Sequence, residues 1–154
     1  MTAGGSRWHY IVLFARLYYG IHFLVSGLNY AVMGVVPDFS KAGAVGDYMA
    51  ALSEVGMYQG VKYLEIVLGA MLVLNRFVPL ALIFMAAISA VIIYLNLLIS
   101  PHPRQLFTGI QELILIGFLL LAYGGHYAGF CKRRSAPLWF WDGLRSNDAG
   151  AHRP

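Results

Sequence analysis

The sequence predicts an all-α integral membrane protein, a four-helix bundle with its N- and C-termini in the cytoplasm. Of its 154 residues, 59% are hydrophobic and only 12% are charged, whereas a soluble domain carries about 25% charged residues. This length accommodates about four spans of roughly 20 residues each. The basic residues lie at the ends of the apolar stretches, as in membrane proteins, so the formal net charge of +4 does not indicate a nucleic-acid partner.

The first predicted span covers residues 9–32, since no Lys, Arg, Asp or Glu occurs between Arg16 and Asp38. No small-residue cleavage site accompanies it, so we expect a span that is retained and not a removed signal peptide. An outer loop, 33–60, follows. Within this loop "DYMAALSEVG" indicates a short surface helix, with Asp47 as its N-cap and Gly56 beyond its end.

Three further spans complete the predicted transmembrane domain. The second covers 61–78, and the third covers 79–99 because Pro79 suits a first helical turn. The segment "SPHPRQ" contains two prolines and breaks the chain before the fourth span, 108–128.

The predicted domain as a whole is 1–134. The tail, 135–154, is expected to lie on the inner membrane surface and to be partly disordered.

The charges of the loops predict the orientation. Basic residues mark the cytoplasmic side of a membrane protein. The two termini and the loop between the second and third spans contain Arg7, Arg76, Lys132, Arg133, Arg134, Arg145 and Arg153. The two opposite loops contain Lys41, Lys62 and Arg104, together with Asp38, Asp47 and Glu54. Both termini are therefore expected inside.

Polar residues in all four spans are predicted to share one layer in the outer half of the membrane. At 1.5 Å per residue, Glu65 and Glu112 each lie about one turn below the outer end of their spans. Asn96 and Ser26 come to the same level, and His22 lies about one turn deeper. We expect Glu65 to meet Glu112 in this layer.

The layer has several possible roles. Ionised carboxylates within a membrane cost about 2.5–3.5 kcal/mol each, and a pair of them favours proton sharing. Such a pair suits a proton relay or hydrogen bonds to a quinone. Alternatively, both glutamates snorkel to water or fix the helices together.

A metal site is less favoured, because the Glu-x-x-His pattern of di-iron bundles is absent. Leu68 and Leu115 stand three residues after Glu65 and Glu112, where that pattern has His. A haem is not predicted, since His22 has no partner histidine at its depth.

Arg16 lies about two turns from the inner end of the first span. It shares a helical face with Gly20, Phe23, Gly27 and Tyr30. The glycines allow close approach of another helix, so this is the expected packed face. Arg16 either snorkels to the inner headgroups, or it binds a ligand or has a structural role. Its expected neighbours are Asn75, Tyr19 and Tyr123.

Short motifs resemble the DoxX family of small four-helix membrane proteins. "ARLYYGIHFLVSGLNY" is similar to the family's first helix, and "LEIVLGAMLVLNRFVPLAL" to its second helix and the following turn. "GIQELILIGFLLLAYGG" is similar to the family's last helix. The matching residues are Arg16, Gly20, Phe23, Ser26, Gly27, Glu65, Gly69, Arg76 and Glu112. Tyr30 stands where the family often has Lys.

The resemblance implies quinone-linked redox chemistry. Related subunits occur in thiosulfate:quinone oxidoreductase, and mycobacterial relatives assemble with redox enzymes at the membrane. We therefore expect a subunit of a redox complex in the bacterial inner membrane, with no metal and no built-in cofactor, and no enzyme activity of its own. It would bind a quinone or similar lipid head group through Glu65 and Glu112, with His22, Ser26, Asn96 and Arg16 as further candidates. The alternative is a non-catalytic scaffold that anchors a partner protein or forms a homo-oligomer.

Overall fold

The computed structural model describes residues 4–34, 43–99 and 102–127, and all regular structure within these ranges is helical. This confirms the predicted all-α class. The tail predicted for 135–154 lies outside the described residues. The elements are α1 (Gly4–Met33), α2 (Ala44–Glu54), α3 (Met57–Val73), α4 (Val78–Tyr94), the π-helical turn η1 (Leu95–Ile99), α5 (Pro103–Ala122) and the 3₁₀ turn η2 (Gly124–Tyr127).

Three of these helical stretches are long and apolar enough to cross a membrane: Arg7–Met33, Val78–Ile99 and Pro103–Ala122. The fourth long helix, α3, has 17 residues and a length of about 25 Å at 1.5 Å per residue. It is therefore somewhat shorter than the hydrocarbon core of a bilayer, which is about 30 Å thick.

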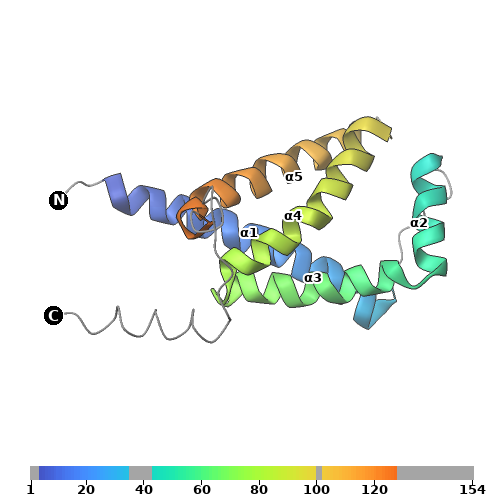
Figure 1. Cartoon of the computed structure of the whole chain (residues 1–154), viewed down its shortest axis with the longest axis horizontal. Coiled ribbons are helices and arrows are strands. Elements are labelled where there is room, and N and C mark those ends of the chain that lie inside the picture. The colour runs from blue at the N-terminus through green and yellow to red at the C-terminus, as the bar shows by residue number, and fades with distance from the viewer. Residues whose placement is uncertain (1–3, 35–42, 100–101, 128–154) are drawn as a thin grey trace, which may run out of the picture.

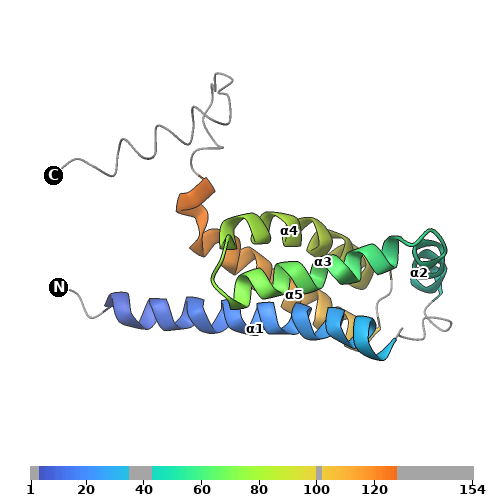
Figure 2. The same ribbon diagram turned by 90° about the horizontal axis from the view of Figure 1, so that it is seen from below.

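The long helices pack in sequence order. α3 lies along α1, the chain then turns back into α4, and α4 and α5 form an antiparallel pair (Figure 1). Seen at 90°, α1 extends well beyond the other helices at its N-terminal end (Figure 2). The short helix α2 stands across the end where α3 begins, and it contacts α3 and η1. All four long helices contribute to one core.

The core residues recur at helical spacing. They are Ala15, Tyr19 and Phe23 of α1, Leu68 and Leu72 of α3, Val78, Ala81, Leu82 and Met85 of α4, and Ile116 and Leu119 of α5. Spacings of three and four residues place these side chains on one face of each helix. The opposite faces expose large apolar side chains such as Phe14, Phe84 and Leu121.

Glycines allow α1 and α3 to approach closely. A Cβ atom on Gly27 would lie 2.6 Å from the carbonyl oxygen of Lys62, and one on Gly69 would lie 2.7 Å from the backbone nitrogen of Leu24. Both contacts are with backbone atoms, which cannot rotate away. The predicted packed face of α1 is confirmed, since Arg16, Gly20, Phe23 and Gly27 are buried and Tyr30 is half-buried.

Three helices begin four or five residues before the predicted spans. α1 starts at Gly4 instead of residue 9, α3 at Met57 instead of residue 61, and α5 at Pro103 instead of residue 108. Proline lacks the N–H that a first helical turn leaves unpaired, so Pro103 begins the helix, although we expected it to lie in the break before the helix. The earlier starts move both buried glutamates to mid-helix: Glu65 is the ninth residue of α3, and Glu112 is the tenth of α5.

The short helix is confirmed, with a different N-cap. α2 begins at Ala44 after Gly43, so Asp47 lies in its first turn instead of capping it. The helix dipole favours an acidic residue there as well. Gly56 has φ +77° and separates α2 from α3, as expected for a residue just past a helix end.

Candidate functional site

The carboxylate of Glu65 binds Lys62, which lies one turn earlier on α3. Lys62 Nζ donates to Glu65 Oε1 at 3.0 Å and to Oε2 at 2.9 Å. The same nitrogen donates to Ser26 Oγ of α1 at 2.9 Å. Since the ammonium has three N–H donors, this geometry uses all of them. The side chains of Lys62 and Glu65 are 15% and 4% exposed, so each charge depends on the other in a poorly solvated place.

Aromatic rings surround this ion pair at the start of α3. Lys62 Nζ lies 5.5 Å from the ring centroid of Tyr58, within the range of a cation–π interaction. Tyr30 of α1 makes edge-to-face contacts with Tyr58 and with Tyr63. These rings hold the ends of α1 and α3 together around the charged pair.

A cavity of about 350 Å³ opens beside the ion pair, between α2, α3 and α4. Lys62, Glu65, Tyr48 and Tyr58 are among its lining residues. The rest of the wall is apolar and includes Met49, Leu52, Met57, Ile88, Ile92 and Leu95. This volume and this pattern, apolar walls with a few polar groups, are typical of small-molecule sites.

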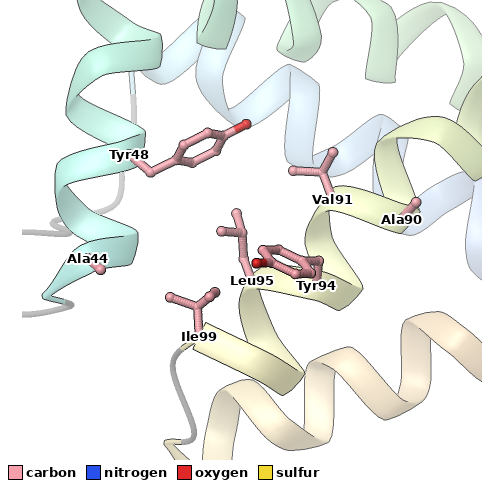
Figure 3. A pocket seen from close by; sticks show the side chains of 7 residues that line it. All are labelled: Ala44, Tyr48, Ala90, Val91, Tyr94, Leu95 and Ile99. Carbon is pink, nitrogen blue, oxygen red and sulfur yellow. The ribbon is translucent and has the colours of Figure 1, made fainter.

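A second cavity of about 540 Å³ adjoins the first. Its lining residues come from α2, α4 and η1, and none of them is charged (Figure 3). Tyr48, Val91 and Leu95 line both cavities. In Figure 3 the ring of Tyr48 reaches from α2 toward α4. The two cavities thus share part of their lining, and the Lys62–Glu65 pair lines the first of them.

Glu112 occupies a different site. Its Oε1 atom is hydrogen-bonded to the Tyr19 hydroxyl of α1 and to the Ser89 hydroxyl of α4, both at 2.6 Å. The two hydroxyl oxygens are themselves 2.7 Å apart. All three residues are buried, and they join α1, α4 and α5.

The predicted meeting of Glu65 and Glu112 is therefore wrong. No hydrogen bond of the described residues joins the two, and each has its own partners. Along α1 the contact residues Ser26 and Tyr19 are seven positions apart, or about 10 Å at 1.5 Å per residue. The carboxylates lie at two levels because of how the helices pack: the Lys62–Glu65 pair contacts α1 at Ser26, whereas Glu112 contacts α1 at Tyr19. The snorkelling alternative is also wrong, since Glu65 is 3% and Glu112 is 5% exposed.

The other predicted site residues are dispersed. Ser26 contacts Lys62, as described above. His22 is exposed on α1, where its ring contacts Phe23. Asn96 is half-buried in η1 and lies against Gly109 of α5. Neither His22 nor Asn96 lines the cavities described here.

Arg16 is buried near the turn between α3 and α4. Its Nη1 atom donates to Asn75 Oδ1 and to the Tyr123 hydroxyl, the latter at 3.3 Å. Two of its three predicted neighbours are thereby confirmed. The third, Tyr19, binds Glu112 and Ser89 instead. The geometry of Arg16 is that of a structural residue that ties α1 and the turn after α3 to the end of α5.

Two residues of these sites were not among the sequence candidates, although the sequence contains a signal for each. Lys62 was placed in the outer loop, but its i,i+3 spacing from Glu65 places both on one helical face. Ser89 is the only polar side chain of α4 apart from the terminal Tyr94. A lone hydroxyl in so apolar a helix indicates a buried hydrogen-bond partner on another helix.

Comparison with known proteins adds no family: no protein-family model, curated protein or solved structure matches the chain.

Proposed function

We propose that this chain is a DoxX-like membrane subunit associated with a quinone-linked redox complex, and that it binds a quinone or similar lipid head group beside Lys62 and Glu65. The observation that carries the proposal is the apolar cavity with an ion pair in its wall. In the proposed topology α1, α3, α4 and α5 form a four-span bundle in the bacterial inner membrane, with both termini in the cytoplasm.

The surface supports a lipid environment. α1, α4 with η1, and α5 are long and apolar enough to span a bilayer, and their outer faces expose large aliphatic and aromatic side chains. The shorter α3 packs against α1 and α4, and its buried face contains Glu65. Lipid tails solvate such outer faces at no cost, whereas water does not.

The cavity suits an amphipathic molecule bound in one orientation, with its head group beside the ion pair. A head group beside the ion pair would find hydrogen-bond donors on the Lys62 ammonium and acceptors on the Glu65 carboxylate. A quinone carbonyl needs donors and a hydroquinone hydroxyl needs an acceptor, so the pair suits both redox states. The uncharged space lined by Tyr94, Leu95 and Ile99 fits an apolar chain. Electrons would come from a partner chain.

A second candidate is a scaffold that anchors a partner protein. It is favoured by the Glu112 site, where the polar atoms of three helices bind one another and serve to fix the packing. The contacts of Arg16 with Asn75 and Tyr123 have the same character. In this reading the buried polar residues hold the helices, and the exposed apolar faces recruit the partner.

Native mass spectrometry of protein extracted gently from its own membrane, with analysis of the released lipids, tests the proposal. We expect stoichiometric quinone with the wild type and with Glu112→Gln, and loss of quinone with Glu65→Gln. A partner chain without any small molecule, unchanged in Glu65→Gln, would support the scaffold and contradict the ligand site.

A steric variant separates loss of binding from loss of the ion pair. Ala87 lines the cavity, so Ala87→Phe fills part of it without removing a polar group. We expect this variant to lose bound quinone while its melting temperature stays close to that of the wild type. The matched control is Ala31→Phe, at an exposed position of α1 away from the cavity. Equal quinone content in both variants would place the ligand elsewhere.

A further inference from the structure

The Tyr19–Ser89–Glu112 site contains three oxygen atoms in a closed triangle. The separations are 2.6 Å from Tyr19 Oη to Glu112 Oε1, 2.6 Å from Ser89 Oγ to the same Oε1, and 2.7 Å between the two hydroxyls. Each separation is that of an O–H···O hydrogen bond, for which about 2.5–3.0 Å is normal. Three hydrogen bonds require three protons.

Counting the protons decides the state of the carboxyl group. Tyr19 and Ser89 each supply one hydroxyl proton, and an ionised carboxylate supplies none. With Glu112 ionised, one edge of the triangle would hold two oxygens in contact with no proton between them. A protonated Glu112 supplies the third proton. Tyr19 can then donate to Ser89, Ser89 to Glu112, and Glu112 back to Tyr19, so that each oxygen donates once and accepts once.

The surroundings agree with a neutral carboxyl group. From α1, Tyr19 faces Glu112, and Arg16 one turn away binds Asn75 and Tyr123. From α4, Ser89 is the facing polar group. On α3, Lys62 binds Glu65 and Ser26. Thus neither the buried Arg16 nor the partly buried Lys62 contacts Glu112, and an ionised carboxylate in this apolar core would lack a counter-charge.

Among the described residues no group of three or more His, Cys, Asp or Glu side chains is arranged to hold a metal ion. The three oxygens lie at the separations of O–H···O hydrogen bonds. We propose that Glu112 is protonated in the folded protein and that the Tyr19–Ser89–Glu112 triad is a binding site for one proton, which locks α1, α4 and α5 together.

Infrared spectroscopy of the full chain in lipid vesicles at neutral pH tests this inference. We expect a carbonyl band of a protonated carboxyl group that shifts when glutamate is labelled with ¹³C. The band should be absent in Glu112→Gln and retained in Glu65→Gln, because Glu65 is paired with Lys62. A wild type without the band, or a band that persists in Glu112→Gln, would overturn the proposal.

Two further variants keep the test independent of whether Glu112→Gln folds. Tyr19→Phe and Ser89→Ala each open the ring and remove one hydrogen bond of the carboxyl group, so the labelled band should change its frequency in both. A band whose frequency is unchanged in both variants would contradict the ring. These spectra do not depend on a bound quinone. The proposal of a proton site and the proposal of a ligand site can therefore be contradicted independently of each other.

Discussion

Glu65 and Glu112 are both buried carboxyl groups at the middle of apolar helices, and their surroundings differ in kind. Glu65 binds an ammonium group and lines a cavity. Glu112 binds two hydroxyls and is enclosed by three helices. The first carboxyl group is compensated by a charge and open to a ligand, whereas the second is compensated by hydrogen bonds and closed. The position of a glutamate in an apolar helix therefore does not indicate its role; its partners do.

Loss of the cation at the first site should have the largest effect. Lys62→Met leaves Glu65 buried without its counter-charge, which costs about 3–5 kcal/mol when such a pair is broken. We expect a large fall in melting temperature, measured by circular dichroism in detergent. The double variant Lys62→Met/Glu65→Leu removes both charges and should recover most of the loss. Additive losses in the double variant would show that the two side chains are not coupled.

The close approach of α1 and α3 supports the first site and should be the next most sensitive feature. Gly27→Ala places a methyl group 2.6 Å from the backbone oxygen of Lys62 and 2.6 Å from Ile66 Cγ1. Such overpacking costs about 1–3 kcal/mol, and it should displace Lys62 and reduce quinone binding. The matched control is Gly117→Ala in α5, where nothing lies within 4 Å of the added Cβ. If both variants melt alike, the helices are not in the described contact.

Removal of a hydroxyl at the second site should have a smaller effect. Ser89→Ala deletes one hydrogen bond of Glu112 and leaves a buried acceptor short of a donor, at a cost of about 1–2 kcal/mol. Quinone binding at the first site should not change. Thr108→Val removes a hydroxyl that donates to the Arg104 carbonyl on the exposed surface, and such surface changes stay within about 0.5 kcal/mol. Equal thermal stability of the two variants would contradict the described burial of Ser89.

The smallest expected effect is at the exposed contact between α1 and α5. Gln111 Nε2 donates to the Tyr18 hydroxyl at 3.0 Å, on an exposed part of the surface. Gln111→Leu removes this bond without leaving a buried polar group, so we expect a change of at most about 0.5 kcal/mol. A loss as large as that of Ser89→Ala would indicate that this face is covered, for instance by a partner chain.

The sequence by itself determined the helical class, three of the predicted apolar spans and the presence of buried polar residues. Composition and uninterrupted apolar stretches are local properties, and they depend only on which side chains follow one another. The packed face of α1, with Arg16, Gly20, Phe23 and Gly27, was also readable, because helical periodicity places those residues together. The neighbours Asn75 and Tyr123 followed from depth along antiparallel helices.

The tertiary structure alone decided which polar groups meet. The starts of α3 and α5 differ from the predicted ones by nearly the same amount, four and five residues. The different levels of Glu65 and Glu112 therefore come from how the two helices pack against α1, which their sequences do not state. The cavities could not be predicted without knowing that α2 packs across the end of α3 and against η1. No local sequence pattern determines where a short helix packs. Hydrogen-bond partners lie up to 107 residues apart, so only the packing of the helices brings them together.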